Sequence, residues 1–200
     1  MAKRSAPEVN AGSMADIAFL LLIFFLVTTT IEKDSGINRK LPPMEEIDPP
    51  IIKQKNIFTV LLNGKDQLLV EDELMEVADL RDAAVEFLDN NGDETCDYCQ
   101  GNKDPRSSDN PDKAIISLKN ERETSYAAYI SVQNELVAAY NVLRNRRALE
   151  IGPSRGFRDM NFTQMQGNYK DARFVGNKEK LKALIDQIKL EFPQKLSEVQ

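Results

Sequence analysis

The apolar residues of this chain form one long run near its start and are spread periodically through the rest. Residues 17–27 (IAFLLLIFFLV) are uninterrupted apolar positions, and residues 14–31 form an 18-residue stretch with a single charge, Asp16. A helix needs about 20 mostly apolar residues to span a bilayer, with about 17 near the lower limit. The pattern therefore predicts a transmembrane helix over residues 13–31, and no later run predicts a second.

The residues around this run predict a short tail, a linker and one folded domain. Residues 1–12 precede the helix, and residues 32–56 carry four prolines and many charges, which is typical of an extended linker. From residue 57 onward, the spacing of apolar residues alternates between the periods of strands and helices. The expected order is strands 57–62 and 67–70 joined at Asn63-Gly64, helix 73–89, strand 114–118, helix 125–147, helix 178–191 and an edge strand 195–199. We therefore predict an α+β fold of order ββαβαβ over residues 57–200, with an extra helix near the C-terminus.

Composition removes several functional classes. The chain has no His and no Trp, and its 26 basic and 32 acidic residues are interleaved to a net charge of −6. Without His, the commonest general base and most zinc sites are excluded. The acidic, interleaved charge argues against nucleic acid as a partner. We find no phosphate-binding glycine motif and no catalytic constellation, so we expect neither an enzyme nor a cofactor nor a metal site.

Asp16 is the strongest functional candidate in the chain. A carboxylate in a bilayer is costly, usually faces protein or water, and often relays protons. The alternative is a capping box, in which Ser13 caps the helix and Asp16 reaches back to the Ser13 amide. The two hypotheses are compatible with each other.

A cleaved secretory leader is the main alternative to a membrane anchor. Lys3 and Arg4 would then be its basic region, and residues 17–27 its apolar region. The long segment before the apolar run and the acid directly preceding it count against this alternative. It would make the mature protein a secreted binding domain, and the mass of the mature N-terminus distinguishes the two. Lys and Arg flank the run on both sides, so their count does not settle its orientation.

Cys96 and Cys99 form a C-x-x-C pair within a polar loop, residues 90–112. A zinc site needs two more ligands, and a redox site of the thioredoxin type needs a helix start after a strand. A local disulfide that closes the loop in an oxidising compartment is the favoured interpretation. On the helix that follows, Arg144, Arg146 and Arg147 suit either a helix end or a contact with a partner or the cell wall.

These residues together resemble the ExbD/TolR family. Asn10, five intervening residues, Asp16 and the apolar run are similar to the N-terminal signature of that family. Leu41-Pro42, the strand–turn–strand at 57–70 and the strand–helix at 114–140 are similar to its later segments. The cysteine loop and the C-terminal sequence resemble the ExbD branch of Bacteroidota. One departure is Ser13, which stands where family members commonly carry a proline, so the start of the helix is expected to differ.

The resemblance implies a bacterial inner-membrane subunit with a cytoplasmic N-terminus and a periplasmic C-terminal domain. It implies a homodimer inside a pentameric ring of ExbB-like subunits, with Asp16 taking up and releasing protons and Asn10 at the family's upstream position. It further implies that the periplasmic domain passes this work to a TonB-like protein, which opens outer-membrane transporters. A TolR-like role, in which the domain binds peptidoglycan, is the alternative within the family.

Overall fold

The computed structural model describes residues 11–28 and 52–199. The chain consists of two units, residues 1–48 and residues 49–200. Asn10, most of the predicted tail, and residues 32–51 of the predicted linker lie outside the described ranges.

The first unit contains one helix, α1 (Ala11–Thr28). It begins two residues before the predicted start, and the predicted end at residue 31 lies outside the described part of the chain. Its sequence from Ile17 to Val27 is apolar on every side, and Thr28, its last described residue, donates its hydroxyl to the Phe24 carbonyl at 2.7 Å. Within residues 11–28 and 52–199, no helix combines the length and apolar character that crossing a membrane requires.

The second unit is an α+β domain built on a five-stranded mixed sheet. The strands lie in the order β3-β2-β1-β4-β5. Their bounds are β1 (Ile57–Leu62), β2 (Leu68–Val70), β3 (Glu73–Met75), β4 (Ile115–Asn120) and β5 (Leu196–Val199). Strands β1, β2 and β3 pair as an antiparallel meander, whereas β4 is parallel to both β1 and β5. The last strand lies at an edge, as predicted.

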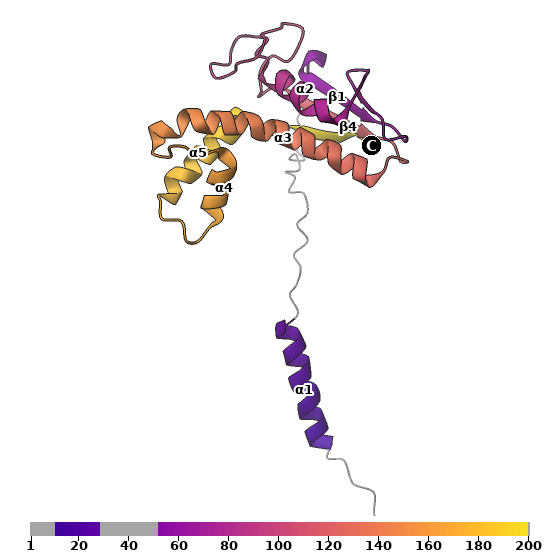
Figure 1. Ribbon diagram of the computed structural model, residues 1–200, viewed down its shortest axis with the longest axis vertical. Helices are drawn as coiled ribbons and strands as arrows, with labels where there is room; N and C mark the ends of the chain where they lie inside the picture. The colour runs from indigo at the N-terminus through magenta and orange to yellow at the C-terminus, as the bar shows by residue number, and fades with distance from the viewer. Residues whose placement is uncertain (1–10, 29–51, 200) are drawn as a thin grey trace, which may run out of the picture. The chain divides into compact units, whose positions relative to one another are not determined.

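Helices α2 (Val77–Asp89) and α3 (Tyr126–Ile151) pack on each other and cover one face of this sheet (Figure 1). Alternate strand residues, such as Phe58, Val60 and Leu62, point into the resulting core and are buried. Each parallel pair needs a long crossover, which α2 supplies between β1 and β4 and α3 begins between β4 and β5. The core therefore lies between the sheet and these two helices.

The turn between β1 and β2 is longer than the predicted Asn63-Gly64 hairpin. The Asn63 side chain accepts the Lys65 and Gln67 amides at 2.9 Å each, and the left-handed residue is Asp66 (φ 59°). Gly64 is needed for close approach instead, because a Cβ there would lie 3.0 Å from the Glu123 Cβ.

The predicted helix 73–89 is wrong over its first four residues. Glu71 and Asp72 both adopt positive φ (52° and 69°) and turn the chain back, so that residues 73–75 form β3 against β2. The helix begins only at Val77. Two acids with left-handed backbone carry no glycine or asparagine signal, which is why the sequence pattern did not indicate a turn.

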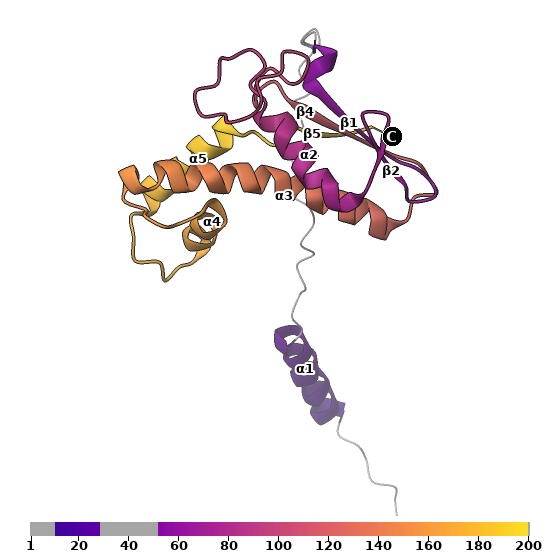
Figure 2. The same ribbon diagram turned by 45° about the horizontal axis from the view of Figure 1, so that its top comes forward.

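A helical lobe follows α3, made of α4 (Phe162–Lys170) and α5 (Lys178–Glu191), and it has an apolar cluster of its own. Both helices lie against the C-terminal half of α3, away from the sheet (Figure 2). Helix α5 has the predicted bounds. Helix α4 is not among the elements predicted from the sequence, and it begins at a capping box formed by Asn161 and Gln164.

Candidate functional site

Asp16 lies in the second turn of α1 and is exposed. Large apolar side chains on the same helix are 40–75% exposed, including Ile17, Leu22 and Val27. Ser13 lies within α1, two residues after the first residue of the helix. Asp16 is the one acid in α1, and the apolar part of the helix begins directly after it.

Cys96 and Cys99 are joined by a disulfide in the structure, with a Cα–Cα distance of 5.6 Å. Asn91 holds this part of the loop by accepting the Cys96 amide at 3.0 Å and donating to the Cys96 carbonyl at 2.9 Å. Between the two cysteines, Tyr98 donates its hydroxyl to the Glu191 carbonyl at 2.8 Å. The bridge therefore helps to present Tyr98 to the end of α5. No metal-binding cluster of His, Cys, Asp or Glu occurs within the described ranges.

The residues just before β1 are tied to the far end of the same loop by Asp109. Asp109 is buried, ion-pairs with Lys53 at 3.1 Å and with Lys55, and accepts from the Asn56 side chain at 3.3 Å. Its own amide donates to the Asn56 side-chain oxygen at 2.7 Å. The hydrogen bond from Lys55 holds the pKa of Asp109 well below its ordinary value, against the opposing effect of burial. Residues 53–56, predicted as the end of the linker, therefore belong to the domain, with a short helical turn at Gln54–Asn56.

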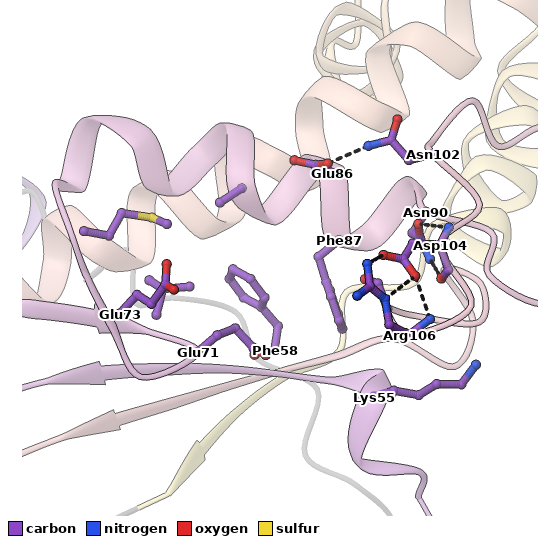
Figure 3. Close-up of a pocket in the computed structure, with 14 residues that line it drawn as sticks. Lys55, Phe58, Glu71, Glu73, Glu86, Phe87, Asn90, Asn102, Asp104 and Arg106 are labelled. Atoms are coloured by element: carbon purple, nitrogen blue, oxygen red, sulfur yellow. Dashed lines mark hydrogen bonds and ion pairs between the residues drawn. The ribbon is translucent and has the colours of Figure 1, made fainter.

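A cavity with a volume of about 520 Å³ lies between α2 and the β2–β3 edge of the sheet (Figure 3). The rings of Phe58 and Phe87, with centroids 5.0 Å apart, form its floor. Its rim carries four carboxylates, from Glu71, Glu73, Glu86 and Asp104.

Most polar groups on this rim already have partners. Arg106 pairs with Asp104 through two hydrogen bonds of 2.9 and 3.2 Å, and Asn102 donates to Glu86 at 2.6 Å. Lys55, the other cation of the lining, is engaged by Asp109. The rim therefore has a net negative charge above an aromatic floor, which suits an apolar group next to a cation. The sequence pattern did not predict this cavity, because its walls come from four segments far apart in the chain.

The three arginines near the end of α3 are used inside the domain. Arg144 is buried and donates to the Phe192 carbonyl at 2.7 and 3.0 Å. Arg146 forms a two-pronged ion pair with buried Asp89 at 2.6 and 2.7 Å, and Arg147 pairs with Glu191 at 2.6 Å. These contacts join α3 to α2 and to the end of α5, so the arginines are a structural clamp rather than a free basic surface.

The described residues thus form an apolar N-terminal helix with a single acid and an α+β domain built on a mixed sheet. The family model for "Biopolymer transport protein ExbD/TolR" matches residues 2–145, well over half of the chain. The chain therefore belongs to the ExbD/TolR family of biopolymer transport proteins. A comparison with curated proteins gives no match.

Proteins of this family are in general associated with the inner membrane and work with ExbB-like and TonB-like partners. The matched region contains Asp16 and ends inside α3, so the helical lobe and β5 lie beyond it.

Proposed function

We propose that this chain is the ExbD-type subunit of a motor in the bacterial inner membrane that uses the proton gradient to energise TonB-dependent transport. Residues 13–31 cross the membrane, with residues 1–12 in the cytoplasm and the domain in the periplasm. The proposal rests on the sequence of that segment and on family membership, because the described helix stops at Thr28. Its partners are a pentameric ExbB-like ring, a TonB-like protein and a second copy of the chain.

The observation that carries the proposal is one acid at the start of an apolar helix within the family-matched region. Moving one charge through 100 mV releases about 2.3 kcal/mol. That energy does work only if proton uptake changes what the helix prefers to face. A charged Asp16 favours a hydrated or polar surface of the ring, whereas a neutral one tolerates an apolar surface, and alternation between the two biases the motion.

The test is Asp16→Asn in cells that depend on energised uptake. The variant keeps the shape of the side chain but cannot carry a proton, so we expect normal insertion, normal co-purification with the ExbB-like ring, and loss of uptake. Asp34→Asn, an acid just beyond the predicted span, is the matched control and should keep uptake. Uptake at the wild-type rate in Asp16→Asn would refute the proposal.

The acidic pocket of Figure 3 is our candidate contact for the TonB-like partner. Its aromatic floor and net negative rim suit a segment that carries an apolar side chain beside a basic one. Glu73 is an exposed rim residue, and Glu73→Lys should therefore weaken partner binding without unfolding the domain. Unchanged binding by both Glu73→Lys and Glu86→Lys would exclude the pocket as the contact.

A TolR-like role is the second candidate, favoured by a smaller hollow of about 280 Å³. Tyr126, 76% exposed, and Tyr129 line it together with Asn120, Thr124 and Glu198. Aromatic faces beside amide, hydroxyl and carboxylate groups suit a saccharide. Retention on purified peptidoglycan that Tyr126→Ala abolishes would support this role, and absence of retention would exclude it.

A further inference from the structure

The basic residues of the folded domain are concentrated in its C-terminal part. Residues 146–199 contain eleven Lys and Arg and seven Asp and Glu, a net charge of +4, whereas residues 52–145 contain ten and eighteen, a net charge of −8. The helical lobe, which contains most of this positive charge, lies beyond the family-matched region. Its charge therefore lies outside the family-matched region.

The connection between α4 and α5 presents this charge together with an exposed apolar side chain. Val175 is fully exposed, at 101%, and lies between Arg173 and Lys178, with Lys170 at the end of α4. Among the described residues, no ion pair joins Lys170 or Arg173 to an acid. A basic loop with an apolar tip is the combination that binds the interface of an anionic bilayer.

Hydrogen bonds hold this loop in one conformation. Asp171 accepts the Arg173 amide at 2.9 Å through its side chain and the Lys178 ammonium at 2.6 Å through its carbonyl. Asn177 then caps α5 by accepting the Lys180 amide at 2.9 Å. Phe174 packs against the apolar cluster of the lobe, so Val175 projects from a fixed base.

We infer that the α4–α5 loop, residues 170–178, is a docking surface for anionic phospholipid on the membrane that anchors the chain. This inference rests on the proposed anchor. Residues 32–51 extend at most about 3.6 Å each, so they keep the domain within roughly 70 Å of that membrane. The bilayer is then present at high effective concentration around the domain. Salt screens charges that are more than about 8–10 Å apart, so the bilayer attracts the basic loop only when the loop is close to its surface.

The experiment uses the full-length chain in lipid nanodiscs, with tryptophan as the probe. The natural chain has no Trp, so Val175→Trp supplies a single fluorophore at the tip of the loop. Leu74→Trp is the matched control, because Leu74 is 70% exposed on β3 in the acidic part of the domain. Discs contain acyl chains that carry bromine, which quenches nearby Trp, and either neutral lipid alone or about one third anionic lipid.

We expect strong quenching and a blue-shifted emission for Val175→Trp in anionic discs, weak quenching in neutral discs, and none for Leu74→Trp. Reversing two loop charges with Lys170→Glu and Arg173→Glu should lower the lipid-bound fraction about tenfold or more, since each basic group near an anionic surface changes affinity roughly fivefold. The same reversal at Lys65 and Lys119, exposed in the sheet half, should have little effect.

Three results would overturn the inference. They are equal quenching in neutral and anionic discs, no quenching in either, or a blue shift that occurs only when the ExbB-like ring is added to neutral discs, which would indicate a protein surface. Failure of the chain to enter nanodiscs would instead refute the proposed anchor. Asp16→Asn should leave the quenching of Val175→Trp unchanged, which separates this surface from the proton-carrying role.

Discussion

Asp109 lies shortly before β4. Replacing it by asparagine is expected to destabilise the domain more than the same replacement at any other acid near this strand. Its side chain is 1% exposed and accepts from Lys53, Lys55 and the Asn56 amide group. Asparagine keeps the shape but removes the charge that two lysines face. Removing one partner of a fully buried ion pair costs about 3–5 kcal/mol. Lys53 is 65% and Lys55 27% exposed, so water compensates in part, and we expect a loss of roughly 2–3 kcal/mol.

The pH dependence follows from the depressed pKa of Asp109 in the folded state. A carboxyl that ionises more readily when folded stabilises the fold above its unfolded pKa, near 3.9, and loses that contribution as the pH falls below it. The wild-type domain should therefore exceed Asp109→Asn in stability at pH 7. The difference should shrink progressively below about pH 4.

Far-UV circular dichroism of the full chain in detergent, followed through urea and heat, measures both effects. For a domain of this size, 2–3 kcal/mol corresponds to a fall in Tm of roughly 5–10 °C. Asp112→Asn is the matched control, because Asp112 is 74% exposed and pairs only with Lys195 at the surface. An Asp109→Asn variant as stable as Asp112→Asn, or a difference that does not change with pH, would refute the account of this network.

Three further perturbations test the packing of the domain. Arg146→Ala leaves buried Asp89 without its two-pronged partner and should lower the unfolding free energy by about 2–3 kcal/mol in urea melts; a loss below 0.5 kcal/mol would contradict the clamp. Reducing the Cys96–Cys99 disulfide should lower the unfolding free energy by about 2 kcal/mol, as chain entropy predicts for so short a loop. Urea melts that are unaltered by reductant would show that the bridge contributes nothing. Leu143→Ala, in the core, should cost about 2–5 kcal/mol by thermal melting, whereas Leu149→Ala, 50% exposed, should cost less than about 0.5; equal losses would contradict the assigned burial.

Local patterns predicted those elements whose signals lie within a few residues. Helix α5 was predicted with its observed bounds, because its apolar spacing is regular and Pro193 follows it closely. Strands β1, β2, β4 and β5 were predicted to within a few residues for the same reason. Helix α4 was not predicted, because Gly156, Gly167 and Gly176 interrupt the helical pattern in and around it, although Asn161 and Gln164 form a capping box at its start.

Features that depend on distant segments could not be predicted in this way. Strand β3 forms where a turn at Glu71 and Asp72 brings residues 73–75 back alongside β2. Asp109 gains its environment from Asn56, 53 residues earlier in the chain, and Phe58 meets Phe87 only after the sheet and α2 have packed. Buried charges and cavity floors are products of tertiary packing, which periodicity along the chain does not encode.

We propose that Asp16 carries protons across the membrane within the assembled motor. Proton flux into vesicles that hold the chain together with its ExbB-like ring tests this role, with the flux recorded by a trapped pH-sensitive dye after a membrane potential is imposed. We expect the wild-type complex to acidify the lumen faster than vesicles with the ring alone, and the complex with Asp16→Asn not to do so. Equal flux through the wild-type and Asp16→Asn complexes would contradict it.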